Sequence, residues 1–309
     1  MPELPEVETT VRQIKRAVLG LSIKDVWTDY GSPHHLGKKN IKDRPFFEKF
    51  KKTVIGKKIV GTSRIGKHVL IHLSDGVTIL THMKMSGHFL YGTYKKVKNT
   101  WVPGEEREAL FDPYNRFIHL VFTLSNDKHL AFCDLRKFAK ITFFHDNERN
   151  SVADLSVIGP DPLDKKFTLK YFKKRLFEKP HGKIKQVLMD QSIIAGIGNI
   201  YSDEILFVAG VHPEEKVENI SYQKLQRMFS ATRLILKHSI KIGGDSASDF
   251  RTLDGKKGGF QHMHNAYRKT GQKCPQKNCG GTIIRKKVGG RSAHFCNRHQ
   301  RLLKKNRVL

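Results

Sequence analysis

Apolar residues at the start of the chain recur with the period of a helix. One apolar face comprises Val7, Val11, Ile14 and Val18. Their spacing of three or four residues predicts an amphipathic helix, and Gly20 predicts its end. Pro5 suits the first turn of such a helix, and acidic neighbours suit its positive dipole end. We therefore expect the N-terminus to be anchored on a packed helix.

Short apolar and β-branched runs follow this helix. Turn residues at 74–76 (Ser-Asp-Gly) and 125–127 (Ser-Asn-Asp) separate two pairs of runs, which predicts antiparallel hairpins. The expected strands are 26–27, 58–60, 69–73, 77–80, 117–124, 130–134 and 140–144. They predict an antiparallel β-sandwich. The segment 87–114 is a long polar and partly aromatic insertion between strands, and the sequence assigns it no function.

The helical period returns after a Gly-Pro-Asp-Pro sequence at 159–162, where we place a linker. Leu169, Phe172 and Leu176 share one helical face. Further helices are expected at 183–190, 200–208 and 222–240, and a mobile Gly-, Ser- and Asp-rich loop at 243–259. The chain is thus predicted to be an α+β protein with a β-sandwich domain at 1–154, a helical domain with a loop at 155–260 and a hairpin module at 261–309.

Charge narrows the class of partner. The 309 residues include 57 Lys and Arg against 29 Asp and Glu, a formal net charge of +28. Between Arg251 and Leu309 there are 16 Lys or Arg and a single acid, Asp254. Such a field favours a polyanion, and no apolar run approaches the roughly 20 residues of a membrane-spanning helix. We expect a nucleic-acid partner and no membrane segment or signal peptide.

The basic C-terminal stretch contains closely spaced metal-ligand residues. Cys274 and Cys279 form one pair, and Cys296 and His299 form another after a hairpin-length spacer. This pattern predicts one tetrahedral zinc ion, structural because three thiolates and an imidazole leave no open position. His299 is the least certain ligand: it could instead be an exposed histidine of a basic tail, and His294 and His262 are weaker competitors.

The hairpin of this module is expected to present a cation. Gly289 and Gly290 predict the turn, and Arg291 follows at the tip, where it can reach a phosphate.

Cys133 lies alone in an apolar run and is most simply a small core residue. Because the cysteines suggest no disulfide framework, we expect a reducing, cytoplasmic compartment.

Pro2 follows the initiator methionine, and Glu3 follows directly. Removal of Met1 would leave a secondary amine, which adds to a sugar carbon to give an iminium. An α-amino group titrates near 7.7–8.0, so a sizeable neutral fraction exists around neutral pH. The alternative is that Pro2 merely protects the N-terminus while the glutamates open the helix.

Taken together, these residues resemble the formamidopyrimidine-DNA glycosylase family, from end to end. The matching motifs are Met1-Pro-Glu-Leu-Pro-Glu-Val-Glu8, Arg64-Ile-Gly-Lys67, His82-Met-Lys-Met-Ser-Gly87, Asp134-Leu-Arg-Lys-Phe138, Met189-Asp-Gln to Gly198-Asn-Ile-Tyr201, Asp254-Gly-Lys and Gly290-Arg-Ser to Cys296. The resemblance implies excision of 8-oxoguanine and formamidopyrimidines from DNA, followed by lyase cleavage at the abasic site. It also implies a helix-two-turn-helix in the helical domain and a zinc-finger hairpin.

The resemblance assigns catalytic roles. Pro2 would attack the sugar C1′, Glu3 would protonate the ring oxygen, and Glu6 would support them. Lys67 matches the lysine that assists elimination, although taken alone it is an ordinary strand-entry lysine. Arg291 matches a zinc-hairpin arginine that contacts phosphate and is implicated in the final elimination.

The resemblance also assigns DNA contacts. Met85, Arg136 and Phe138 match the trio that fills the space left by the extruded base, although alone Met85 and Phe138 would be taken for core residues. Asn199, at a turn between two helices, and Lys185 match phosphate ligands. Damaged double-stranded DNA would be the partner, with no small-molecule cofactor, and the protein is expected to be a monomer.

The sequence departs from the family at several positions. His299 replaces a usual cysteine, and the first Cys pair is spaced by four residues where two is commoner. Ala139 stands where glycine is common, and Phe117 lies near a usual phosphate-contacting histidine. His119 remains nearby, and we transfer a DNA contact to neither position.

Two other functions compete. The related endonuclease VIII group shares the nucleophile but favours oxidised pyrimidines; Leu4 and the full-length loop at 243–259 favour the purine enzyme. A non-catalytic zinc-hairpin DNA or RNA binder would need only charge and metal. A free N-terminal amine next to Glu3 has no use in such a binder.

Overall fold

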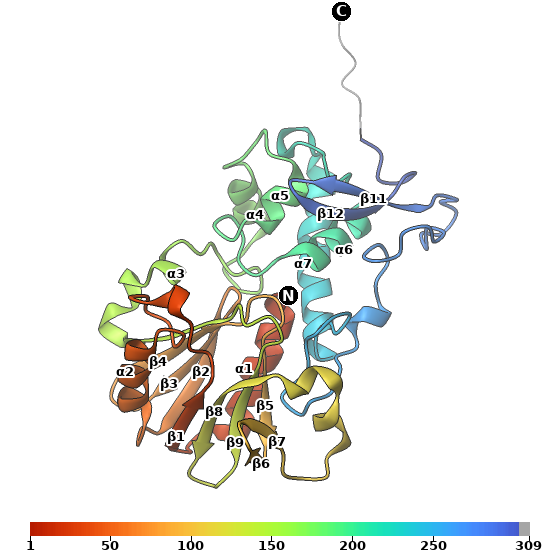
Figure 1. Cartoon of the computed structure of the whole chain (residues 1–309). Coiled ribbons are helices and arrows are strands. Elements are labelled where there is room, and N and C mark those ends of the chain that lie inside the picture. Colours follow the sequence, from red (N-terminus) through yellow and green to blue (C-terminus); the bar gives the residue numbers. More distant parts are fainter. Residues whose placement is uncertain (303–309) are drawn as a thin grey trace, which may run out of the picture. The chain divides into compact units, whose positions relative to one another are not determined.

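The computed structural model describes residues 1–302 of the chain (Figure 1). It forms two compact units. The first comprises residues 1–156 together with 240–261, and the second comprises 157–239 together with the described residues from His262 onward. None of the helices among residues 1–302 has the length and apolar character needed to cross a bilayer.

The first unit begins with helix α1 (Leu4–Val18) and contains two four-stranded antiparallel sheets. One sheet has the order β1-β8-β9-β5 and the other the order β10-β4-β3-β2. The strands are β1 (Ile23–Thr28), β2 (Ile59–Ile65), β3 (His68–Leu73), β4 (Val77–His82), β5 (His88–Gly92), β8 (Ile118–Leu124), β9 (His129–Cys133) and β10 (Lys140–His145). The turns at 74–76 and 125–127 join β3 to β4 and β8 to β9, so the predicted sandwich and both hairpins are confirmed.

One core joins the two sheets to α1. Val7, Ile14 and Val18 of α1 are fully buried and pack in the same cluster as residues of both sheets. Helix α1 contacts β2, β3 and β5, and Figure 1 shows it alongside these strands. The apolar period of the first residues thus anchors the N-terminus on the sandwich.

The first unit has further elements that the sequence did not predict. They are α2 (Arg44–Val54), β6 (Tyr94–Val97), β7 (Thr100–Pro103), α3 (Ala153–Ser156) and the 3₁₀ helices η1 (Pro33–His35), η2 (Glu108–Phe111), η3 (Pro113–Arg116), η4 (Asp146–Ser151) and η6 (Phe260–His262), whose last residue belongs to the second unit. The insertion at 87–114 therefore contains its own hairpin, β6-β7, and a 3₁₀ helix. The sequence pattern predicted none of these short elements.

The second unit is helical and ends in a hairpin. Its elements are α4 (Leu169–Leu176), α5 (Ile184–Met189), α6 (Asn199–Ala209), η5 (Val217–Asn219), α7 (Tyr222–Lys241), β11 (Ile283–Val288) and β12 (Arg291–Cys296). The chain passes into this unit at Val157, and 240–261 pack with the first unit. The sequence-based division had instead placed the loop at 243–259 in the helical domain. Long-range hydrogen bonds, described below, account for the difference.

Candidate active site and metal centre

The start of α1 holds the Pro2-Glu3 pair in a defined conformation. Glu3 is the N-cap residue of α1, and the amide of Glu3 donates to Oε2 of Glu6 at 2.8 Å in a reciprocal capping box. Pro5 lies in the first turn, where its missing N–H costs no hydrogen bond. Pro2, Glu3 and Glu6 are all buried. The two carboxylates therefore order the backbone directly after Pro2.

Glu6 also accepts a hydrogen bond from the distant loop. The amide of Asp245 donates to Oε1 of Glu6 at 2.7 Å. A Cβ at Gly244 would lie 2.9 Å from the same oxygen, and the φ of Gly244 is +82°, so glycine allows this close approach. Both oxygens of Glu6 are thus occupied by backbone amides. The sequence did not indicate this second contact.

Two basic residues lie at the end of β2 and in the turn that follows it. Arg64 Nε bonds Oε2 of Glu8 at 2.9 Å. Burial acts to raise the pKa of Glu8, but the hydrogen bonds from Arg64 and Arg12 lower it overall. Lys67 follows in the turn and is largely buried. Burial, together with the charges of His68, Lys84 and Lys67, lowers the pKa of His82 to about 2, so that ring is neutral near pH 7.

The three residues expected to fill the base void are accessible. Met85 is half-buried, whereas its neighbour Met83 belongs to the core. Phe138 is 52% exposed, and the guanidinium of Arg136 lies 4.6 Å from the centre of its ring. An exposed aromatic ring stacked on an arginine is available to a base, whereas a core residue is not. The core interpretation of Met85 and Phe138 is therefore wrong.

A buried carboxylate holds the loops of this trio together. Asp134 is fully buried; its Oδ1 accepts from the hydroxyl of Ser86 at 2.6 Å, and its Oδ2 accepts from the amide of Ala139 at 2.8 Å. The hydroxyl of Tyr30 also donates to Oδ2, and the amide of Arg136 donates to Ser86. Asp134 thus links the Met85 loop to the Arg136 loop. Its position at the start of the Asp-Leu-Arg-Lys-Phe motif was visible in the sequence, but this role was not.

Two departures from the family pattern are accommodated in this region. Ala139 is buried with a negative φ, so glycine is not required there. His119 lies 2.8 Å from Asp29 through Nδ1. Phe117 is half-buried beside Arg116. These contacts agree with the decision to assign neither Phe117 nor His119 to DNA.

In the second unit, the turn between α5 and α6 places Asn199 at a helix N-terminus. Asn199 is the first residue of α6, and its Oδ1 is buried without a hydrogen-bond partner among residues 1–302. Gln191 closes the turn by donating to the carbonyls of Met189 and Ile197 and accepting from the amide of Gly196. The positive dipole end of a helix suits an anion. A phosphate contact at Asn199 stays a prediction.

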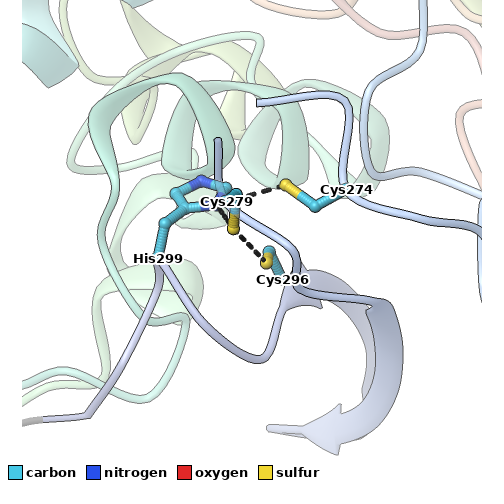
Figure 2. A group of neighbouring side chains, drawn as sticks. All are labelled: Cys274, Cys279, Cys296 and His299. Atoms are coloured by element: carbon cyan, nitrogen blue, oxygen red, sulfur yellow. Dashed lines mark hydrogen bonds between the residues drawn. The ribbon is translucent and has the colours of Figure 1, made fainter. Parts of the chain in front are cut away.

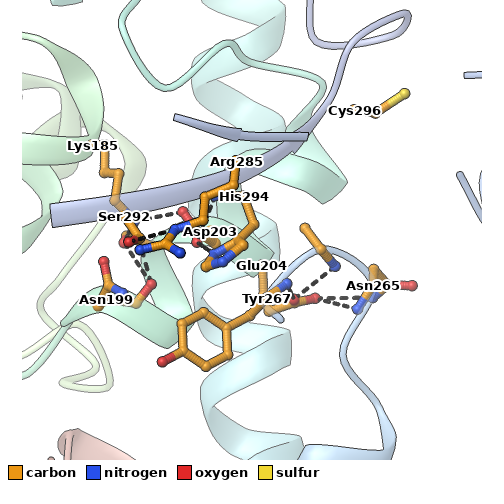
Figure 3. Close-up of polar contacts among 12 residues, drawn as sticks. Lys185, Asn199, Asp203, Glu204, Asn265, Tyr267, Arg285, Ser292, His294 and Cys296 are labelled. Atoms are coloured by element: carbon orange, nitrogen blue, oxygen red, sulfur yellow. Dashed lines mark hydrogen bonds and ion pairs between the residues drawn. The ribbon is translucent and has the colours of Figure 1, made fainter. Parts of the chain in front are cut away.

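Lys185 does not face solvent (Figure 3). Its side chain is 0% exposed, and Nζ bonds Oδ1 of Asp203 at 2.5 Å and the hydroxyl of Ser202 at 3.2 Å. It also reaches the carbonyl of Asn199 at 3.4 Å. The expectation that Lys185 contacts phosphate directly is therefore not met in this structure, because a buried ammonium paired with a carboxylate is unavailable to DNA. Lys185 instead supports the first turn of α6.

The other oxygen of Asp203 holds the hairpin. The amide and Nδ1 of His294 both lie 2.9 Å from Oδ2 of Asp203. The adjacent Glu204 accepts from the amides of Ala266 and Tyr267 at 3.0 and 2.8 Å. Figure 3 shows these two carboxylates side by side on α6, each holding a different segment of the C-terminal module.

The tip of the hairpin presents Arg291. Gly289 and Gly290 have φ values of +54° and +78°, the combination that a two-residue hairpin turn requires. Arg291 is exposed directly after them and, with Lys183 and Gln186, lines a groove of about 510 Å³. The predicted hairpin turn and the exposed cation are both present.

Four ligand atoms converge beside this hairpin (Figure 2). Cys274, Cys279, Cys296 and His299 each offer one atom, and these atoms all lie within 4.8 Å of one another. Cys279 Sγ lies 3.5 Å from Cys296 Sγ and 3.7 Å from His299 Nδ1, and Cys274 Sγ lies 3.4 Å from that nitrogen. A tetrahedral zinc ion with bonds of about 2.0–2.3 Å separates its ligands by about 3.4–3.8 Å. The four residues therefore fit zinc, and His294 and His262 are outside the cluster.

Second contacts orient the ligands. Nε2 of His299 lies 3.1 Å from the carbonyl of Phe207 in α6, so Nε2 carries the proton and Nδ1 is left for the metal. Burial acts to raise the pKa of Cys279, but hydrogen bonds with His299 and Cys296 lower it to about 6. Burial raises the pKa of Cys274 to about 12. A central divalent cation would ionise all three thiols.

Three family models match the chain in order. The N-terminal domain of formamidopyrimidine-DNA glycosylase matches residues 1–141, its H2TH domain matches 158–251, and a zinc finger found in FPG and IleRS matches 271–298. The zinc-finger match and the Cys₃His cluster support one structural zinc ion.

Relatives match over nearly the whole length. The formamidopyrimidine-DNA glycosylase of Pelotomaculum thermopropionicum is 36% identical over 296 residues, 96% of this chain and 98% of that protein. The Bacillus subtilis protein of the same name is 35% identical over 301 residues, 97% and 99% of the two chains. Lactococcus lactis Fpg in complex with abasic-site DNA has a TM-score of 0.80 at 31% identity, covering 97% of this chain and 100% of that one.

Proposed function

The chain belongs to the formamidopyrimidine-DNA glycosylase family, and from that membership we propose that Pro2 is the nucleophile that excises oxidised purines from DNA. The family acts in base-excision repair as a glycosylase and abasic-site lyase. Solved relatives bind DNA that contains an abasic site, Fapy-dG or carbocyclic 8-oxo-G. We assign this chain the same lesion class: 8-oxoguanine and formamidopyrimidines in double-stranded DNA.

The observation that carries the proposal is the ordered Pro2-Glu3-Glu6 start of α1. Once Met1 is removed, the Pro2 nitrogen attacks C1′ of the lesion nucleotide, and the C1′–base bond breaks. The sugar ring opens as Glu3 protonates its oxygen, and a C1′ iminium remains on Pro2. Glu6 supports the pair because its carboxylate fixes the amide of Glu3. Water releases the sugar fragment after elimination.

Elimination of the two phosphates needs cations. We assign Lys67 and Arg291 to this step: Lys67 lies in the β2-β3 turn, and Arg291 directly follows the β11-β12 turn. Asn199, at the start of α6, binds backbone phosphate. Met85, Arg136 and Phe138 occupy the space that the extruded base vacates, which offsets part of the few kcal/mol that extrusion costs.

Zinc would be held by Cys274, Cys279, Cys296 and His299, where it fixes the hairpin that presents Arg291. It supplies structure and no reacting group. We further propose that the protein acts as a monomer, without a small-molecule cofactor, in the cytoplasm at the nucleoid. The excess of cations predicts binding that weakens steeply as salt rises.

Borohydride trapping tests the proposed nucleophile. The mature protein should form a covalent adduct with abasic-site DNA in borohydride, because reduction makes the iminium permanent. One extra residue before Pro2 should abolish the adduct and leave DNA affinity within about twofold, whereas the same residue added at the C-terminus should change neither. Trapping that persists with the N-terminus extended would rule out Pro2. Faster release of thymine glycol than of 8-oxoguanine would contradict the lesion class.

A further inference from the structure

The loop at 243–259 is docked on the first unit by a buried arginine. Arg251 is 2% exposed, and its Nε lies 3.0 Å from Oδ2 of Asp112. Its Nη1 donates to the carbonyls of Ser248 and Phe250 at 3.0 and 2.8 Å. The guanidinium lies 4.7 Å from the centre of the Tyr114 ring. A loop whose composition predicted mobility thus has a buried charged anchor.

A buried arginine stabilises a docked loop only when its charge and its N–H groups have partners. Burying a guanidinium is unfavourable unless a carboxylate and further acceptors replace its water. Here Asp112 supplies the charge partner and two loop carbonyls accept from Nη1, whereas Nε makes no hydrogen bond within residues 1–302. Burial acts to raise the pKa of Asp112, but pairing with the Arg251 guanidinium lowers it overall. Asp112 also accepts from the amide of Tyr114 at 3.0 Å, so the acid is fixed by the 3₁₀ helix that it begins. Asp112 is therefore held by its own 3₁₀ helix as well as by Arg251.

A second contact lies a few residues further along the loop. The side-chain amide of Asn115 donates to the carbonyls of Gly255 and Ala109 at 3.1 and 2.7 Å. A Cβ at Gly255 would lie 2.6 Å from the carbonyl oxygen of Ala109, and the φ of Gly255 is +82°. Only glycine allows so close an approach with this backbone. The insertion and the 3₁₀ helix after it thus form the surface on which the loop rests.

The near end of the same loop touches the proposed active site. Its Asp245 amide bonds Oε1 of Glu6, while Oε2 of Glu6 accepts from the amide of Glu3. The amide of Leu253 donates to Oε1 of Gln13, also on α1, at 2.9 Å. The docked loop is therefore bonded to the helix that carries Pro2 and Glu3.

We propose that Arg251 is a positioning residue: by docking the loop on Asp112 and Tyr114, it keeps the Asp245 amide on Glu6 and so orders the Pro2-Glu3 pair for attack. This inference rests on the proposed function and gives the insertion at 87–114 a task. When the anchor is lost, one oxygen of Glu6 loses its amide and the N-terminus samples more conformations. Misplacement of a reacting group slows the chemical step. The proposed phosphate contacts of the second unit are unaffected.

The test compares R251M with a matched control, R107A. Arg107 lies in the same insertion, but its side chain is 36% exposed and pairs with Glu105 at 2.6 Å and with loop residue Asp254 at 3.7 Å. The rate of 8-oxoguanine excision is measured in single turnover with enzyme in excess. It is then divided by the concentration of active enzyme, which borohydride trapping determines. R251M should excise 8-oxoguanine at least tenfold more slowly than the native chain, while its Kd for DNA changes by less than threefold. R107A should change both the excision rate and the Kd by less than twofold.

Proteolysis and a conservative substitution separate positioning from a general loss of stability. Lys256 and Lys257 are exposed in the loop, and trypsin should cleave after them at least tenfold faster in R251M. R251K, which keeps a charge for Asp112, should recover at least threefold of the lost excision rate. If R251M is poorly folded, D112N serves instead, because it keeps the shape and removes the charge.

The outcomes are distinguishable. If the native chain is not trapped on abasic-site DNA, the proposed function fails. If the native chain is trapped, but R251M or D112N matches R107A in excision rate and trypsin cleavage, the anchor fails and the function stands. An R251K chain no faster than R251M would also overturn the charge-based anchor. A loss of DNA affinity equal to the loss of rate would show a binding role instead of positioning.

Discussion

Lys185 offers the sharpest test of the structure against the sequence, because the two assign it different work. The sequence motif suggests a phosphate ligand. In the structure, Lys185 and Asp203 are 0% and 1% exposed and joined at 2.5 Å. Replacing lysine by methionine keeps most of the volume and removes the ammonium. Among residues 1–302, Asp203 would then be buried with the amide and the ring N–H of His294 as its remaining donors, each at 2.9 Å.

The size of the effect follows from that geometry. Removing one partner of a buried ion pair costs about 3–5 kcal/mol, because it leaves a buried charge uncompensated. Because two donors of His294 still face Asp203, we expect K185M to lower the free energy of unfolding by about 3 kcal/mol, the lower end of this range. In K185M/D203N the charge is removed as well, and we expect at least about 1 kcal/mol to return. K183M is the control: Lys183 pairs with Glu214 at 2.7 Å but is 45% exposed, so its loss should cost about 0–1 kcal/mol.

Two measurements decide between the assignments. Urea unfolding followed by circular dichroism gives the change in stability, and DNA affinity across a salt series counts phosphate contacts. A direct contact contributes about 0.9 to the slope of log K against log salt. The buried pair predicts that K185M lowers the free energy of unfolding and leaves this slope unchanged. Unchanged stability with a slope smaller by about one would refute the structural reasoning and restore Lys185 as a phosphate ligand.

Three further predictions concern other parts of the molecule. H299C should retain one zinc per chain by metal analysis, whereas H299A should bind zinc about 10–100-fold more weakly in a chelator competition; equal retention by both would exclude His299 as a ligand. R136A should slow excision more than R12A, because Arg12 is 57% exposed and pairs only with Glu8 on its own helix; equal rates would count against the void assignment. Burial lowers the pKa of His68 to about 4, whereas its pKa in the unfolded chain is near 6.5. Between these two pKa values the unfolded chain binds more protons than the folded one, so the free energy of unfolding decreases as the pH decreases. H68Q should flatten that fall by up to about 1.4 kcal/mol per pH unit between pH 6.5 and 4, as measured by urea unfolding, and an unchanged slope would contradict a neutral buried ring.

Local patterns predicted most of the regular structure. The period of Val7, Val11, Ile14 and Val18 identified α1, and turn residues located the β3-β4 and β8-β9 hairpins. Helices α4 to α7 also followed from spacing. Helix α2 was missed although Phe46, Phe47, Phe50 and Val54 are spaced as one helical face and pack on the core, the first two only partly buried. The β6-β7 hairpin was missed because its strands are short and largely exposed.

Two features of the candidate site were not visible in the sequence because they depend on contacts distant along the chain. Lys185 is eighteen residues from Asp203, and nothing local to Lys185 shows that a carboxylate faces it. The sequence did show that Asn199 and Asp203 are four residues apart and therefore share one face of α6. A partner of one of them could thus have been expected near the other. The loop at 243–259 was expected to be mobile from its Gly, Ser and Asp content. Its order depends on Asp112 and Glu6, which lie far away along the chain.

Helix α6 connects the structural metal site to the proposed phosphate site at Asn199. Asn199 begins the helix, Asp203 and Glu204 hold β12 and the 265–267 segment, and the carbonyl of Phe207 accepts from zinc ligand His299. The first turn and the metal cluster are therefore bonded to one rigid element of eleven residues. Loss of zinc would free His299 from its fixed orientation and remove one of these attachments. Within residues 1–302, the bonds of His294 to Asp203 and the packing of Phe207 on Ile283 and Cys296 would still join the hairpin to α6. Zinc removal should therefore loosen the hairpin that presents Arg291 more than the helix start at Asn199.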